Sequence, residues 1–341
     1  MPSFRTIAAV CVLAVTMAGA ASAAPYPPVA SGPMKGWTTL TTTKVSKGAS
    51  VFRSAVADYV AVTRPDGGLS LSRVNMAFPS PIPDAAWKVM TKSGAITEPH
   101  CVTTPDATNA AKYYIYCLTL NATGKAQFTG IYSTSSSEFS VIGSPTALDG
   151  TTSLFAPVFL APTTLATAGY PYVFQFTAAV QSMSGHLSAR NMKINQALYS
   201  ATTDGSGAWA DLATAFTGVP GCTGDAQLCA GVSTGNQVML FHYAGSSGNN
   251  KPFFFGASPV LAAGLSGEVA AVAVTATKYV IVARGKDGQL YETVYNNNSF
   301  SAWVAQGGAI MPLTQPSCLP TTGGVTCVVQ GSDGYLYARA M

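Results

Sequence analysis

The sequence predicts an all-β protein made of six copies of one four-stranded antiparallel unit, arranged as a six-bladed β-propeller. Three observations support this prediction. A hairpin glycine recurs at a nearly constant interval, an aromatic-anchored strand follows most of these hairpins, and a lone strand-like segment lies near the N-terminus. Repeat periods near 50 residues with four strands each are typical of propeller blades.

The repeated unit is clearest in the last third of the chain. Residues 268–274 and 278–284 are β-rich runs, and Asp287-Gly288 forms a turn into a third run at 289–295. Trp303 marks a fourth segment. An Asp-Gly pair between two apolar runs is a strong hairpin signal, because glycine accepts the positive φ that such a turn needs.

The hairpin position places the same unit along the rest of the chain. Asn is the usual substitute for Gly in the left-handed region of backbone space. The six hairpin residues, spaced 57, 61, 51, 52 and 46 residues apart, are Gly67, Gly124, Gly185, Asn236, Gly288 and Gly334. An apolar second strand is expected before each of them, at Tyr59–Thr63, Tyr113–Leu120, Tyr172–Phe176, Gln227–Val232, Tyr279–Ala283 and Val325–Val329. Fourth strands are expected at residues 87–90, 139–142, 209–212 and 253–255 and at Trp303.

The sixth unit has no fourth strand of its own, because the chain ends at Met341. Residues 36–40, which include Trp37, resemble a fourth strand, but they do not follow a first, second and third strand of the repeat. A terminal strand that completes the last blade closes a propeller and leaves no long free sheet edge. We therefore expect blade 6 to combine both ends of the chain. A pair of β-sandwiches would also account for many strands, but not for the recurring hairpins or for Trp37.

The cysteines form three local couples. Cys11 lies in the predicted signal peptide, and six cysteines remain. In each couple the first cysteine follows a Pro-x pair and falls in a first strand, and the second falls in a second strand. An even number of grouped cysteines in an exported chain indicates disulfides. Zinc is the poorer alternative, because no pair of histidines lies near the cysteines at ligand spacing. We expect bridges within blades 2, 4 and 6, between Cys101 and Cys117, Cys222 and Cys229, and Cys318 and Cys327, and we expect no metal and no cofactor.

Composition excludes several classes of protein. The chain is 48% hydrophobic and only 9% charged, which argues against a disordered chain. Four glutamates in 341 residues argue against a coiled coil or a helical array. The formal net charge is +4, with no run of Lys or Arg, so we expect no nucleic-acid partner.

The N-terminus has the pattern of a secretory signal peptide. Arg5 precedes an apolar run at residues 7–18, and Ala21-Ser22-Ala23 follows as a cleavage site. No later stretch is long and apolar enough for a transmembrane helix. We expect residues 1–23 to be removed and residues 24–341 to form a single propeller domain, secreted to the periplasm or the medium.

Blades 5 and 6 resemble a known family. Residues 280–291 (VIVARGKDGQLY), the following Trp303 and Gly307-Gly308, and residues 328–337 (VVQGSDGYLY) resemble the repeats of tectonin-like and fucose-binding bacterial propeller lectins. The resemblance implies sugar binding in pockets between neighbouring blades. The sequence departs from the family where tryptophan often follows the leucine, since Tyr291, Tyr337 and, in blade 1, Ser70 stand there.

Sugar binding needs an aromatic surface and a few fixed polar groups on a rigid scaffold. The candidate ligand-binding residues on the hairpin strands are Arg284, Tyr291, Tyr295, Tyr337 and Arg339, with glycans as the expected partners. Packing is the alternative role for each tyrosine. The four tryptophans recur at one position of the blade, which favours packing between blades over direct stacking on a ligand.

No catalytic motif is evident. The sequence has no G-x-S-x-G, no H-E-x-x-H and no calcium loop, and its three histidines are scattered. Residues 202–209 are similar to the Asp-box turn of sialidases, but the glycine comes one position late. The sequence thus predicts a noncatalytic carbohydrate-binding propeller. Two alternatives stay open: a secreted glycoside-active enzyme, which needs a carboxylate pair in the central channel, or a protein-binding scaffold, which needs a broad exposed apolar patch.

Overall fold

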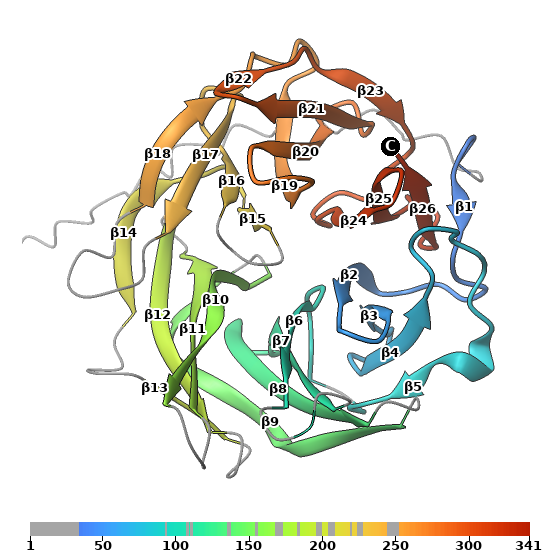
Figure 1. The fold of residues 1–341 in the computed structure, drawn as a ribbon, viewed down its shortest axis with the longest axis vertical. Helices are drawn as coiled ribbons and strands as arrows, with labels where there is room; N and C mark the ends of the chain where they lie inside the picture. Colours follow the sequence, from blue (N-terminus) through green and yellow to red (C-terminus); the bar gives the residue numbers. More distant parts are fainter. Residues whose placement is uncertain are drawn as a thin grey trace, which may run out of the picture.

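The computed structural model describes residues 34–341 except 93, 107–108, 110–111, 135–137, 154–155, 168–172, 183–184, 196–199, 204–208, 219, 224–227 and 244–251. Within this part of the chain, six antiparallel sheets are arranged radially around a central axis (Figure 1). The predicted six-bladed propeller is therefore confirmed. The predicted signal peptide and the Asp-box-like turn fall wholly or partly outside the described residues.

Each blade begins at the axis and proceeds outward by hairpins. Blade 1 contains β2 (Lys47–Arg53), β3 (Asp58–Thr63), β4 (Leu69–Val74) and β5 (Lys88–Val89), and blade 2 contains β6 (His100–Pro105), β7 (Tyr113–Leu120), β8 (Lys125–Thr134) and β9 (Glu138–Thr152). Blade 3 contains β10 (Val158–Thr167), β11 (Val173–Gln181), β12 (His186–Asn195), β13 (Ser200–Thr203) and β14 (Ala210–Ala215), and blade 4 contains β15 (Gly221–Cys222), β16 (Cys229–Val232), β17 (Val238–Tyr243) and β18 (Pro252–Ala257). Blade 5 contains β19 (Leu265–Ala273), β20 (Lys278–Gly285), β21 (Leu290–Asn296), β22 (Ser299–Phe300) and β23 (Val304–Gly307). Among the described residues, helix occurs only as the short 3₁₀ turn η1 (Asp84–Ala86).

Blade 6 is built from both ends of the chain, as predicted. β24 (Ser317–Thr321), β25 (Gly324–Gln330) and β26 (Leu336–Ala340) pair in order, and β1 (Thr38–Thr39) completes the sheet against β26. Figure 1 shows the blue N-terminal strand beside the red C-terminal strand. The outer edge of β26 is thereby covered, which closes the ring.

The predicted hairpin residues adopt the conformation that the prediction required. Each has a positive φ, from 60° at Asn236 to 89° at Gly334, in the left-handed region that Gly and Asn tolerate best. The tryptophans also share one place. Trp37, Trp87, Trp209 and Trp303 each stand one residue before an outer strand, namely β1, β5, β14 and β23.

The hydrophobic core is divided into six clusters, one at each interface between neighbouring blades, which we call a seam. The seam between blades 1 and 2, for example, packs Phe52 and Leu71 of blade 1 against Ile115 and Ile131 of blade 2. The other five seams have equivalent clusters. Because side chains alternate between the two faces of a strand, every blade supplies half of two seams.

All three predicted disulfides are present. Cys101 lies directly opposite Cys117, Cys222 opposite Cys229, and Cys318 opposite Cys327, each on the first two strands of its blade. This confirms the predicted blade register, because a shift of one residue would have turned these side chains to opposite faces. Within the described residues, no helix is long and apolar enough to cross a membrane.

Candidate functional site

The outer part of the seam between blades 5 and 6 contains a cluster of four polar and aromatic side chains. Trp37 and Arg339 belong to blade 6, and Glu292 and Gln306 belong to blade 5. The guanidinium carbon of Arg339 lies 5.8 Å from the ring centre of Trp37, and its Nη1 donates to the backbone oxygen of Gln306 at 2.5 Å. The side-chain amide of Gln306 donates to Oε2 of Glu292 at 2.7 Å. We refer to these four residues as the seam cluster.

Local backbone geometry explains this gathering. Leu290 pairs with Gly307 and Tyr291 with Ala305, so Gln306 is the extra residue of a β-bulge. A bulge re-aims the side chain of its extra residue. On blade 6, Thr38 pairs with Ala338, which places the preceding Trp37 beside Arg339.

The seam cluster retains unused hydrogen-bonding capacity. Within the described chain, Oε1 of Glu292 has no hydrogen-bond partner, and neither does the buried indole Nε1 of Trp37. Burial raises the pKa of Glu292, while the Gln306 amide and the charge of Lys278 oppose that rise. A guanidinium and a half-occupied carboxylate at one seam can thus offer both donors and an acceptor to a polar ligand.

Blade 3 repeats part of this arrangement. The guanidinium carbon of Arg190 lies 5.9 Å from the ring centre of Trp209, and the strand register matches that of Arg339 and Trp37. Arg190 is buried, however, whereas Arg339 is partly exposed. The preceding blade 2 has Phe128 at the position equivalent to Glu292, so the carboxylate of the seam cluster is not repeated there.

The predicted tyrosines Tyr291 and Tyr337 are held by the hairpin turns that precede them. Tyr291 donates its hydroxyl hydrogen to Oδ2 of Asp287, and Tyr337 donates to Oδ2 of Asp333, both at 2.6 Å. Burial and the neighbouring carboxylate raise the pKa of both phenols to about 12. The motif Asp-Gly-x-Leu-Tyr is therefore a self-contained turn in which the first side chain fixes the last.

The other predicted site residues lie at different depths. Arg284 is 1% exposed and donates from Nε to the backbone oxygen of Ile310, which ties blade 5 to the connection leading to blade 6. Tyr295 is 5% exposed and packs at the seam between blades 4 and 5, and Tyr337 is 2% exposed. Arg339 is the predicted residue that the structure brings into the seam cluster. Ligand contact by the five residues stays a prediction.

The six innermost strands surround a central cavity of about 500 Å³. At the end where these strands begin, Glu98 of blade 2 and Glu268 of blade 5 approach a second, smaller cavity. Oε1 of Glu268 accepts a hydrogen bond from the backbone N–H of Leu313 at 2.7 Å, and Oε1 of Glu98 accepts one from Gln315 at 3.3 Å. Burial is the main reason that the pKa of Glu98 is raised to about 7, and the charge of Glu268 adds to it.

The sequence prediction missed several of these residues. His100 lies in the Pro99-His100-Cys101 segment at the start of an expected first strand, and Glu98 directly precedes that segment. Because first strands line the channel of a propeller, their position was the available signal for both residues. Glu292 and Gln306 lie on blade 5, so their proximity to Arg339 depends on how blades 5 and 6 pack. Among the described residues, no group of three or more His, Cys, Asp or Glu side chains is placed to hold a metal ion.

Comparisons with solved structures agree with the six-bladed β-propeller fold. The chain is similar to the fungal lectin of Aleuria aurantia, described as a six-bladed β-propeller with a novel mode of fucose recognition. The TM-score is 0.56 and the identity 13%, over 88% of this chain and 92% of that one. A point mutant of the same lectin in complex with α-methyl-L-fucoside gives a TM-score of 0.52 at 13% identity, with the same coverage. The sequence itself matches no protein-family model and no curated protein.

Proposed function

We propose that this protein is a secreted, noncatalytic carbohydrate-binding propeller, with a ligand site at the seam between blades 5 and 6. The observation that supports it most directly is the seam cluster, in which a guanidinium, a carboxylate and an indole meet between two rigid sheets. Sugar hydroxyls both donate and accept hydrogen bonds, so they need this mixture of donors and acceptors.

The spare capacity of the cluster sets the role of each residue in this proposal. Arg339 uses one N–H on the Gln306 backbone and directs its remaining N–H donors to ligand hydroxyls. Glu292 accepts from a ligand hydroxyl at Oε1, since Gln306 occupies Oε2. The ring of Trp37 packs against the guanidinium of Arg339 in a cation–π contact and holds it in place. A guanidinium with further N–H donors at the same seam as a half-occupied carboxylate is a site that a polar ligand can complete.

Two further observations are consistent with the proposal. The structural neighbours that share the fold are described as fucose-binding, so fucosylated glycans are the first ligands to test. Three disulfides favour an oxidising compartment, as expected of an exported protein. The resemblance to the bacterial branch of propeller lectins stays a prediction, as does the signal peptide.

The test is a glycan array with the mature protein, followed by calorimetry with methyl α-L-fucoside and with any other glycan that gives a signal. Arg339→Ala and Glu292→Gln should each weaken binding about 10- to 100-fold, the usual value of a hydrogen bond to a charged group. Arg64→Ala is the matched control, because Arg64 pairs with Asp66 in the hairpin of blade 1, far from the cluster. A blank array, or equal losses in the control, would overturn the proposal.

The two alternatives predict different results. A glycoside-active enzyme should release sugar from a glycan substrate and lose that activity in Glu268→Gln. The structure gives Glu268 two other partners, the Leu313 backbone and the Ser266 hydroxyl, which favours a structural role. A protein scaffold needs a broad apolar surface. The most exposed apolar side chains among the described residues, Phe78, Phe253 and Leu313, lie on blade 1, on blade 4 and beyond blade 5.

A further inference from the structure

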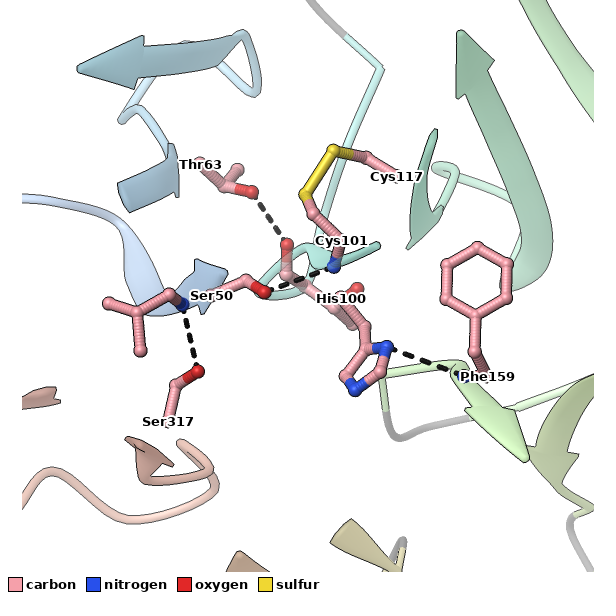
Figure 2. Close-up of a disulfide and its surroundings, with 9 residues drawn as sticks. Ser50, Thr63, His100, Cys101, Cys117, Phe159 and Ser317 are labelled. Carbon is pink, nitrogen blue, oxygen red and sulfur yellow. Dashed lines mark hydrogen bonds between the residues drawn. A yellow bond between two sulfur atoms is a disulfide. The ribbon is translucent and has the colours of Figure 1, made fainter. Parts of the chain in front are cut away.

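The inner edges of three first strands are capped by side chains from the preceding blade. Ser317 Oγ accepts a hydrogen bond from the backbone N–H of Val51 at 2.8 Å, and Ser50 Oγ accepts one from Cys101 at 3.0 Å. His100 plays the same part for blade 3, since its Nδ1 accepts from the N–H of Phe159 at 3.3 Å. Figure 2 shows this series of contacts around the channel. Each bond satisfies an N–H that innermost strands otherwise leave without a partner.

His100 differs from the two serines because its ring has a second nitrogen, Nε2, in addition to the one that caps the strand. Burial lowers the pKa of His100 to about 4, so the ring is neutral at physiological pH. Because Nδ1 accepts a hydrogen bond, the single proton of the neutral ring is on Nε2. Within the described chain, Nε2 has no hydrogen-bond partner. In Figure 2 this second nitrogen lies on the side of the ring that faces away from Phe159.

The cavity beside His100 has the size and lining of a small-molecule site. Its volume of about 500 Å³ lies within the usual range for such sites, roughly 300 to 1,000 Å³. Apolar side chains that contribute to the lining are Val51, Val102, Phe159, Val272 and Leu319. His100 is only partly buried and lines this cavity, so its Nε2–H is open to the cavity and can donate to an acceptor held there.

Charge at the cavity is confined to its two ends. Three titratable residues line it, Arg53, Glu98 and His100, and the ring of His100 is neutral. Arg53 forms an ion pair with Asp58 at 2.6 Å, and Glu98 lies where the first strands begin. An ionic ligand beside His100 would therefore be desolvated without a counter-charge, which is costly.

We propose that the central cavity binds a neutral, ring-sized molecule whose carbonyl or ether oxygen accepts a hydrogen bond from His100 Nε2. The apolar body of the ligand packs against Phe159 and the valines of neighbouring first strands. This site is separate from the carbohydrate site proposed above, because the seam cluster lies on β1, β21, β23 and β26 and their flanks. Either site can therefore fail its test without affecting the other.

The test uses acetophenone as the probe and ethylbenzene as its matched control, which has a similar shape but no oxygen. The protein is labelled with ¹⁵N at its three histidines, His100, His186 and His242. Acetophenone should shift the Nε2–H signal of His100 saturably and leave the other two unchanged. Ethylbenzene should shift it less. The proposal is refuted if the His100 signal does not move up to the solubility limit of acetophenone, or if all three histidines move alike.

A variant isolates the hydrogen bond. His100→Asn keeps an acceptor for the Phe159 N–H but removes Nε2, so it should weaken acetophenone binding about two- to twelve-fold in calorimetry, the range for a neutral hydrogen bond. Ethylbenzene binding should change little. Equal weakening of both probes would show that His100 only shapes the cavity. The titration of the wild-type protein decides the proposal even if this variant does not fold.

Discussion

Replacing Glu98 with glutamine should stabilise the protein at neutral and alkaline pH. Glu98 is 8% exposed, and its carboxylate lies near that of Glu268 at the end of the channel where the first strands begin. Burial raises the pKa of Glu98 from an ordinary value of 4.5 to about 7. The folded protein thus holds the proton of Glu98 more tightly than the unfolded chain does.

The sign and size of the effect follow from proton linkage. Below about pH 4.5 the carboxyl is protonated in both states and costs nothing, and between about pH 4.5 and 7 stability falls as the pH rises. A shift of this size amounts to about 3 kcal/mol, at about 1.4 kcal/mol for each pKa unit. Glu98→Gln removes the charge and keeps an oxygen that can accept from the Gln315 N–H. The variant should gain about 2 to 3 kcal/mol at high pH and almost nothing at about pH 4.

Urea unfolding with the disulfides intact, repeated from about pH 4 to about pH 8.5, measures the effect. The quantity to compare is the difference in free energy of unfolding between variant and wild type, since other titrating groups largely cancel in it. Glu138→Gln, at an exposed position of β9, is the control and should give a difference near zero at every pH. A difference that does not change with pH would refute the reasoning.

Three further predictions concern stability. His100→Asn should remove an acid-sensitive contribution to stability. Because burial lowers the pKa of His100 from 6.5 to about 4, the wild-type protein loses up to about 3 kcal/mol of stability as the pH falls from about 6.5 towards 4. Urea unfolding of the variant over the same pH range should not show this loss. Gly185→Ala should lower the free energy of unfolding by about 1 to 2 kcal/mol because Gly185 has a φ of 83°, whereas Gly323→Ala, equally open to an added methyl group but without a positive φ, should be neutral or stabilising. Replacing both Cys222 and Cys229 with alanine should cost about 2 to 3 kcal/mol, and non-reducing peptide mapping of the wild type should recover the three pairs; a crossed pair would contradict the blade register.

Much of the fold could be predicted from the sequence because its determinants are local. The hairpin residue and the strand before it lie within one blade, as does the tryptophan after the hairpin in blades 1, 3 and 5. Each of these can be recognised without knowledge of the neighbouring blades. Asn236 illustrates this, since its φ of 60° is the conformation that its place in the repeat required. Ring closure by residues 36–40 was also predictable, because the sixth blade was visibly one strand short.

The candidate site was predictable only in part. Arg339 was identified from its strand, but its partners Glu292 and Gln306 come from blade 5 and are gathered by a β-bulge that no sequence motif marks. The burial of Tyr295 and Tyr337 likewise depends on how adjacent blades pack. A strand pattern shows that a tyrosine is half-buried, but not whether the neighbouring blade covers the other half.

The sequence by itself determined the number of blades, their register and the three disulfides, since all of these arise from contacts between residues close together in the chain. The tertiary structure alone decided which side chains face one another across a seam or around the channel. Glu98 and Glu268 lie on blades 2 and 5, and Ser50, His100 and Ser317 belong to three different blades. Their pKa values and hydrogen bonds depend on burial and distance, and these come into existence only when the ring closes.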